Sequence, residues 1–316
     1  MIHSSGLLIF LLDRHTQISA KIAMTDQQKR FIFEQADIRG EVVQLEQAYE
    51  LAIKNRNFPE PIEQLLGQFL AAASLMSSTL KFDGTLSLQA KGSGPLNLIM
   101  AESSNQKSLR AVARMDESVD FNAIDTSDIR TLIGSDGYLA IIIEPDQGER
   151  YQGIVPLDSD NLAGCLEHYF HQSEQIETRF WFAQSKQRCA GLLLQALPKQ
   201  VIANAHDNAE YWQTVNHLAE TVKPEELLDL DQDVLIYRLF NEFEVRAFDS
   251  RPVKFECGCS RERSAKALLS LGENEVNQMI KELGVITIDC QFCLKQYNFN
   301  DSDITELFLQ QKPTLH

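Results

Sequence analysis

Two pairs of closely spaced cysteines near the C-terminus constrain this chain more than any other feature. One glycine separates Cys257 from Cys259, two residues separate Cys290 from Cys293, and thirty residues lie between the pairs. Two close pairs can turn four thiols toward one point, which is the usual way to build a tetrahedral thiolate site. Zinc is the metal that such a set favours, and an iron–sulfur cluster is the alternative. The spacing therefore predicts that these four cysteines hold one zinc ion.

The segment around these cysteines is small for a self-supporting core. From residue 251 to about residue 309 it has roughly sixty residues, which is near the lower limit for a domain that folds on packing alone. A structural zinc contributes about 10–16 kcal/mol on binding at neutral pH, as much as the about 5–15 kcal/mol by which whole domains are stable. We therefore expect the metal to decide whether this segment is folded. Spacing alone favours a structural zinc knuckle over a site whose thiolates are oxidised in use.

The charge balance argues against nucleic acid and membrane partners. The chain carries 45 acidic and 29 basic residues, for a net charge of -16. Residues 251–316 carry eight basic and nine acidic residues, so a zinc-ribbon nucleic-acid binder has only the small basic group Arg261, Arg263 and Lys266 in its favour. No run of eighteen apolar residues occurs, which excludes an apolar membrane-spanning helix.

The N-terminus and the cysteine usage both indicate a reducing compartment. The apolar run 7–12 is followed at once by Asp13 and Arg14 and has no basic region before it, so it is too short for a signal sequence. We expect residues 1–23 to be an upstream extension outside the folded unit, with Met24 opening a more conventional start. Six cysteines without an export signal predict a cytoplasmic protein with reduced thiols.

Residues 24–198 have the pattern of a mixed helix and antiparallel-sheet core. Glu41–Arg56 is expected to be an amphipathic helix, and Ile62–Leu80 is expected to be a helix that is apolar on most sides and belongs in the interior. After this helix, apolar and polar residues alternate with a period of two, which predicts β-hairpins. The expected strands are 85–90, 96–100, 109–115, 138–143, 150–155, 180–182 and 191–197, with a helix at 161–171. This order indicates an α+β fold.

Residues 199–250 form a helical connector between the core and the cysteine segment. Apolar side chains recur at helical spacing from Trp212 to Val222, Pro224 marks a restart, and a short helix follows at 234–240. The segment is too apolar for a solvated linker and too short for a domain. We therefore expect its apolar faces to pack on another part of the chain, with a small zinc-binding domain following at 251–316.

The stretch Val253–Arg263 closely resembles the redox switch of the 33 kDa chaperonin family, the redox-regulated heat-shock holdases. The second cysteine pair, with aromatic residues inside and after it, is similar as well. Further family motifs occur upstream in family order: Arg39-Gly40-Glu41, Lys81–Gly84, Gly92–Asn97 and Gly148–Gly153. The resemblance extends from about Thr25 to Leu309. Ser264 departs from it, because some members have a further cysteine there, outside the four ligands.

The resemblance implies a chaperone core, a metastable helical linker and a C-terminal zinc switch. The reduced, zinc-bound form is then inactive, and oxidation forms the disulfides Cys257–Cys259 and Cys290–Cys293 and releases the zinc. After that step the linker unfolds, the protein forms a homodimer, and the exposed surface holds unfolding client proteins without ATP. Cys165 and Cys189 lie on core elements and are expected to be buried small residues outside this switch.

An enzymatic function finds little support in the sequence. We find no Ser-His-Asp arrangement and no nucleotide fingerprint, and Gly92–Pro95 lacks the following helix that a phosphate site requires. We therefore expect a protein that is not an enzyme.

Overall fold

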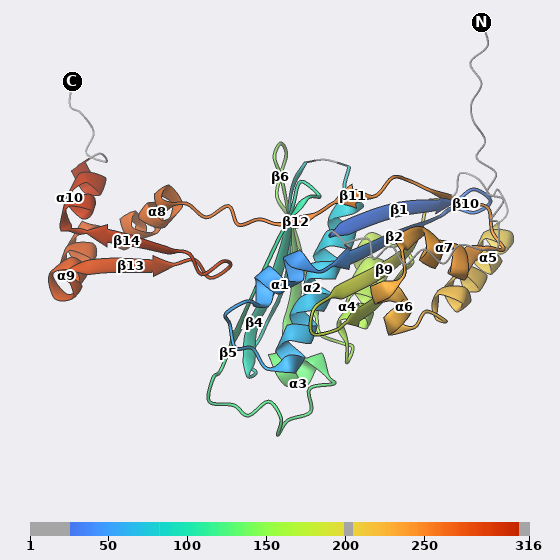
Figure 1. Cartoon of the computed structure of the whole chain (residues 1–316), viewed down its shortest axis with the longest axis horizontal. Coiled ribbons are helices and arrows are strands. Elements are labelled where there is room, and N and C mark those ends of the chain that lie inside the picture. Colours follow the sequence, from blue (N-terminus) through green and yellow to red (C-terminus); the bar gives the residue numbers. More distant parts are fainter. Residues whose placement is uncertain (1–25, 82, 199–204, 310–316) are drawn as a thin grey trace, which may run out of the picture.

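The computed structural model describes residues 26–81, 83–198 and 205–309. The expected upstream extension 1–23 lies outside these ranges. Two six-stranded sheets form the main body, and a small module with a two-stranded sheet lies beside it, at the left of Figure 1. The α+β fold class is confirmed.

The first sheet is antiparallel and has the order β10-β1-β2-β9-β8, with β11 also paired to β1. Its strands are β1 (Gln27–Phe33), β2 (Ile38–Leu45), β8 (Thr178–Gln184), β9 (Cys189–Ala196), β10 (Val245–Ala247) and β11 (Arg251–Pro252). The sheet thus combines strands from near residue 26 with the end of the connector (β10) and the residues just after it (β11).

The second sheet has the order β12-β5-β4-β3-β6-β7 and consists mostly of the expected hairpins. Its strands are β3 (Gly84–Lys91), β4 (Leu96–Ser104), β5 (Ser108–Met115), β6 (Tyr138–Pro145), β7 (Tyr151–Pro156) and β12 (Lys254–Phe255). Strand β12 pairs with β5 in parallel, so the chain that leads into the cysteine segment is itself part of the sheet.

Helix α2 (Glu60–Ser78) lies between the two sheets and contacts strands of both. Its side chains are buried on every face from Leu65 onward except for the half-buried Gln68, which confirms the prediction of an interior helix. The buried serine hydroxyls of this helix form hydrogen bonds; for example, Ser77 Oγ lies 2.7 Å from Ser103 Oγ. The remaining core helices are α1 (Gln47–Ile53), α3 (Ile129–Ile133) and α4 (Leu162–Tyr169), which continues into a π-helical turn, η1 (Phe170–Glu174).

The expected helix at Glu41–Arg56 is wrong in its first part, where β2 extends to Leu45 and only residues 47–53 are helical. Strand β2 lies between β1 and β9 and is buried on both faces, with Val42 in one apolar cluster and Val43 in another. A strand that is buried on both faces has no alternating pattern, so its apolar residues can imitate a helical face.

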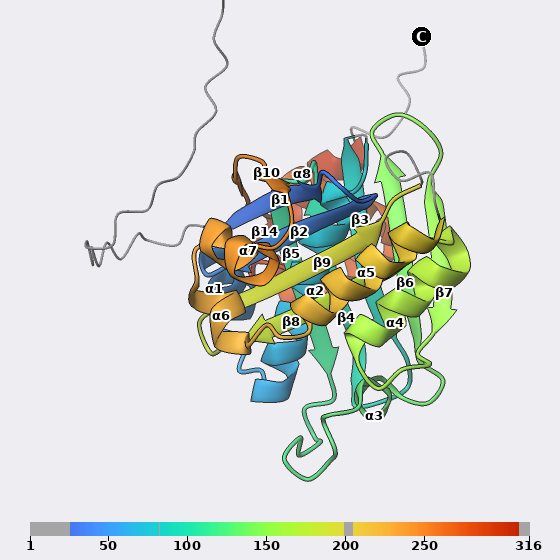
Figure 2. The same ribbon diagram turned by 90° about the vertical axis from the view of Figure 1, so that its right-hand side faces the viewer.

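The connector contains α5 (Ala205–Ala219), α6 (Pro224–Asp229) and α7 (Gln232–Phe240), which cover the outer face of the first sheet (Figure 2). This confirms the prediction that its apolar faces pack on another part of the chain. The interface has an aromatic centre, in which Phe240 lies against Phe31 and Phe33 with ring centroids 5.7 and 5.2 Å apart. Buried Gln44 donates from Nε2 to the carbonyls of Leu227 and Leu230, each at 2.8 Å. It thereby provides hydrogen bonds to carbonyls at the C-terminal end of α6 that have no partner within the helix.

The C-terminal module has its own apolar cluster. It contains α8 (Arg261–Leu271), α9 (Glu273–Leu283), β13 (Val285–Asp289), β14 (Gln296–Asn300) and α10 (Asp301–Leu309). Eight buried side chains form the cluster, which is much smaller than either cluster of the main body. None of the helices in the described ranges combines the length and the apolar character that a membrane crossing requires.

We predict that Phe240→Ala loosens the connector selectively. Truncating this ring, which is 1% exposed, removes about 3–5 kcal/mol of packing between α7 and the first sheet. Hydrogen exchange of the amides in α6 and α7 should then be faster, while those of α2 keep their protection. Tyr237→Ala on the same helix is the control, because that side chain is 68% exposed. Equal exchange in both variants would contradict the prediction.

Candidate metal centre

The four cysteines of the two motifs come together in one cluster. Their sulfur atoms all lie within 4.8 Å of one another. The shortest separations join the two motifs, 3.5 Å from Cys257 to Cys290 and 3.4 Å from Cys259 to Cys293. The first pair lies between β12 and α8, and the second pair lies at the tip of the β13–β14 hairpin, which faces the main body in Figure 1.

Local hydrogen bonds hold each pair in place. In the hairpin tip the Cys290 amide donates to the Lys295 carbonyl at 2.9 Å, and the Leu294 amide donates to the Cys290 carbonyl at 2.8 Å. Leu294 has a φ of 59°, a left-handed conformation that costs a non-glycine residue about 1–2 kcal/mol. In the other pair, the Arg263 guanidinium donates to the Gly258 carbonyl at 2.7 Å.

The arrangement fits a tetrahedral metal ion. A zinc ion with Zn–S bonds of about 2.3 Å places its sulfurs about 3.8 Å apart, which lies within the range of separations found here. All four cysteines are free thiols and are partly buried. The cluster could therefore hold a metal ion, and thiolate sulfur is the ligand type that zinc accepts readily.

One hydroxyl supports the cluster from within the module. Tyr297 donates from its hydroxyl to the Cys259 sulfur at 3.1 Å. Burial acts to raise the pKa of Cys259, but this hydroxyl and then the neighbouring thiols outweigh it and lower the pKa to about 7. For Cys293, burial followed by the neighbouring thiols raises the pKa to about 12, against the opposing effect of the Lys295 amide. The Tyr297 hydroxyl therefore stabilises negative charge on the Cys259 sulfur.

Three arginines of the main body hold the turn between Cys290 and Cys293. Arg56 donates from Nη2 to the carbonyls of Gln291 and Phe292, at 2.5 and 2.7 Å. Arg114 donates from Nε to Oε1 of Gln291 at 3.0 Å, and the Arg110 guanidinium lies 4.1 Å from the centre of the Phe292 ring. Sequence reasoning missed all three, because no local pattern relates the turn after α1 or the strand β5 to a motif so far along the chain.

Two of these arginines also interact with the cysteines. Burial lowers the pKa of Arg56, and the charges of Cys290 and Cys293 act in the opposite direction. Burial likewise acts to lower the pKa of Arg110, but Glu102 and then Cys257 outweigh it and raise the value. The cluster therefore lies in a positive environment that the main body provides.

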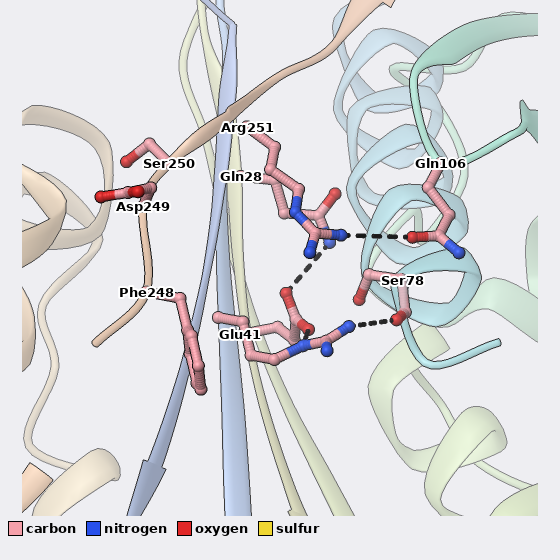
Figure 3. A pocket seen from close by; sticks show the side chains of 9 residues that line it. Gln28, Glu41, Ser78, Gln106, Phe248, Asp249, Ser250 and Arg251 are labelled. Carbon is pink, nitrogen blue, oxygen red and sulfur yellow. Dashed lines mark hydrogen bonds and ion pairs between the residues drawn. The ribbon is translucent and has the colours of Figure 1, made fainter. Parts of the chain in front are cut away.

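Residues 248–251, at the end of the connector, cover a cavity of about 280 Å³ in the main body, and most of the residues that line it are polar or charged (Figure 3). Below the segment 248–251, Arg30 donates to Oε1 of Glu41 at 2.8 Å and to the Ser78 carbonyl at 2.7 Å. Glu41 is 1% exposed and also accepts from Gln28 Nε2 at 3.2 Å. The segment thus lies over an ion pair whose carboxylate is buried.

The other residues considered in the sequence lie in structural environments. Cys165 on α4 and Cys189 on β9 are buried, as predicted. Arg261 pairs with Asp303 at 2.9 Å and lies 4.3 Å from the centre of the Phe299 ring, so it is held inside the module.

Comparison with known proteins now identifies the family. A family model described as Hsp33 protein matches residues 26–300. The chain belongs to the Hsp33 family. A 33 kDa chaperonin from Ectopseudomonas mendocina is 46% identical over 287 residues, which cover 90% of this chain and 96% of the relative. A 33 kDa chaperonin from Pseudomonas aeruginosa strain UCBPP-PA14 is 46% identical over 286 residues, with 90% and 95% covered.

A solved structure shares the Hsp33 fold. The crystal structure of the 33 kDa chaperonin (heat shock protein 33 homolog) from Thermotoga maritima matches with a TM-score of 0.77 at 22% identity. The match covers 90% of this chain and 99% of that chain. Hsp33 is a family of heat-shock chaperones and not of enzymes, so membership supports a chaperone role with unfolded proteins as partners.

We predict that Tyr297→Phe weakens metal binding while the module still folds. The substitution keeps the ring in its cluster but removes the donor to the Cys259 sulfur, and loss of such an outer contact raises the metal dissociation constant about ten- to a hundredfold. Competition with a zinc chelator measures this constant. Tyr237→Phe, which removes an exposed hydroxyl on α7, is the control. Unchanged affinity would show that the hydroxyl does not stabilise the thiolate.

Proposed function

We propose that this protein is a redox-regulated, ATP-independent holdase chaperone whose reduced, zinc-bound form is inactive. The observation that carries the proposal is the four-sulfur cluster, which lies in a module with little core of its own. Along the chain, this module follows a connector that covers an apolar sheet face. Loss of the metal at such a site would affect more than the module. This combination favours a switch over a purely structural zinc knuckle.

In the proposed reduced form, Cys257, Cys259, Cys290 and Cys293 bind one zinc ion as thiolates. The zinc would link the segment before α8 to the β13–β14 hairpin and so hold the module together. The proposed divisions of the chain are a chaperone core at 24–198, a metastable linker at 199–250 and a redox-switch domain at 251–316. Strands β10, β11 and β12 pair with the core sheets on both sides of the boundary at 250, so the two parts are joined through the core.

In the proposed activation, each neighbouring cysteine pair is oxidised to a disulfide, Cys257–Cys259 and Cys290–Cys293. Two thiolates of a pair lose two electrons and form one S–S bond, while one molecule of hydrogen peroxide takes up the electrons and leaves as two hydroxide ions. Two molecules of peroxide therefore consume all four thiolates. The ligand set is then lost, and the zinc leaves the protein.

The exposed surface would come from the linker and the sheet that it covers. Helices α5–α7 bury residues of β1, β2 and β9, including Phe31, Phe33 and Leu192. Once the module no longer holds the segment 248–251 in place, α7 loses its C-terminal anchor. Unfolding of the linker would then uncover an apolar face of the kind that binds unfolded proteins. We expect a homodimer in the oxidised state, a cytoplasmic location, and no nucleic-acid or membrane partner.

We predict that peroxide with mild heat both releases zinc and activates the protein. The expected result is loss of bound zinc together with suppressed aggregation of a thermally unfolding client, measured on the same sample by a zinc indicator and by light scattering. A reduced, zinc-loaded sample at the same temperature should not protect the client. Failure to protect when all four thiols are oxidised would overturn the chaperone mechanism proposed here, and salt-dependent binding of RNA by the reduced protein would favour the zinc-ribbon alternative.

We predict that Cys290→Ser abolishes tight zinc binding, because a hydroxyl does not replace a thiolate in a four-sulfur site. Cys165→Ala is the matched control, since that cysteine is buried in the core and lies outside the cluster. Zinc content after dialysis, measured by atomic absorption, tests both variants. Full zinc content in Cys290→Ser would show that the ligand assignment is wrong.

A further inference from the structure

Two arginines of the core lie beside the metal centre and contact the turn between Cys290 and Cys293. Arg56 follows α1 and lies in the electrostatic field of Cys290 and Cys293, and Arg110 on β5 interacts with Cys257. Both also hold the turn at residues 291–292, Arg56 through two carbonyls and Arg110 through the Phe292 ring. The core therefore contacts the turn that carries Cys290 and Cys293, independently of the covalent connection through β12.

Arg56 is a half-buried cation without a counter-charge from the protein. Within the described residues it has no carboxylate in ion-pair distance, and its Nε is buried without a hydrogen-bond partner. Its neighbours Asn55 and Asn57 both have left-handed backbones, with φ of 60° and 50°, so the turn that presents it is an unusual one. A partly buried cation is costly unless a negative group compensates it.

The thiolate centre is the missing counter-charge. Four thiolates around one divalent ion leave a net charge of about −2, in a place where partial burial reduces screening by water. Arg110 already pairs with Glu102, whereas the partners of Arg56 on the protein are the two carbonyls and the ring of Phe58, 5.7 Å away, none of which is a negative charge. We infer that Arg56 and Arg110 dock the C-terminal module on the core by compensating the charge of the reduced metal centre, so that oxidation weakens this interface directly. The inference rests on the zinc assignment proposed above.

Oxidation weakens docking because it removes the negative charge of the four sulfurs. When each cysteine pair gives two electrons to one peroxide and becomes a disulfide, the four sulfurs are neutral. Arg56 then remains partly buried with no negative partner, and water competes successfully for its guanidinium. The hydrogen bond between Arg114 and the Gln291 side chain involves no cysteine, so its strength should be the same in the reduced and the oxidised protein. Oxidation should therefore release the module from the core even before the linker unfolds.

The experiment measures docking in the full chain by energy transfer. Donor and acceptor dyes are introduced through non-canonical amino acids at two exposed positions, Ser118 on the core and Leu283 on the module, because cysteine labelling would modify the centre. Measurements are made at low temperature, and hydrogen exchange of α6 and α7 verifies that the linker is folded. Zinc content is determined in every sample.

The variants separate charge from packing. Arg56→Gln and Arg110→Gln should each lower the ratio of docked to undocked reduced protein about three- to tenfold, and Arg56→Lys should retain most of the docking. Arg130→Gln is the charge-matched control, because Arg130 pairs with Asp128 in its own turn of the core. Raising the salt concentration should undock the reduced wild type but leave the oxidised wild type unchanged.

A second readout reports on the sulfur atoms themselves. With cobalt(II) in place of zinc, removal of Arg56 should shift the thiolate-to-metal charge-transfer band to longer wavelength, because a nearby cation stabilises the sulfur electrons. A role confined to holding the turn would leave the band in place.

The outcomes are distinct. Docking that is unchanged in the zinc-loaded double variant Arg56→Gln/Arg110→Gln, or reduced equally by Arg130→Gln, overturns this inference and leaves the proposed function intact. Absence of zinc from the reduced wild type overturns the metal assignment and this inference with it. Docking that depends on both arginines only in the reduced, metal-loaded state supports the inference.

Discussion

The outer face of the first sheet has to be covered, and the rest of the structure depends on how this is done. Strands β1, β2 and β9 present aromatic and aliphatic side chains there, and α5–α7 bury them. The buried ring of Phe240 and the hydrogen bonds from Gln44 join the two layers. An apolar sheet face of this size is stable in water only when other residues bury it. A protein that can remove the cover under control can bind other apolar chains.

In the function proposed above, the C-terminal module exerts that control. It follows the connector along the chain and has only a small apolar cluster, so we propose that a zinc ion on the four sulfurs supplies much of its stability. The chain from the end of α7 to the first cysteine contributes β11 and β12 to the two sheets, and its segment 248–251 covers the buried Glu41. In the proposed switch, oxidation of the sulfurs would affect the linker through this short stretch of chain, and it would affect the core through Arg56 and Arg110.

The sequence predicted the hairpins of the second sheet and the interior helix α2 because each has a clear period or an unbroken apolar run. It failed at β2, where burial on both faces removes the alternation that distinguishes a strand. It also gave no indication of β1, because only the last three residues of this strand are apolar. Gln28, Lys29 and Arg30 precede them, and each has a specific partner in the fold.

By itself the sequence determined that four cysteines can form one thiolate site, since close pairs bring their sulfurs together whatever the surrounding fold. It also determined that the connector needs a partner surface, because its apolar residues recur at helical spacing. Only the tertiary structure decided which surface that is, and only the tertiary structure placed Arg56, Arg110 and the Tyr297 hydroxyl around the sulfurs. The two arginines are far from the cysteines along the chain. Their position follows from the packing of α1 and β5, which no local pattern records.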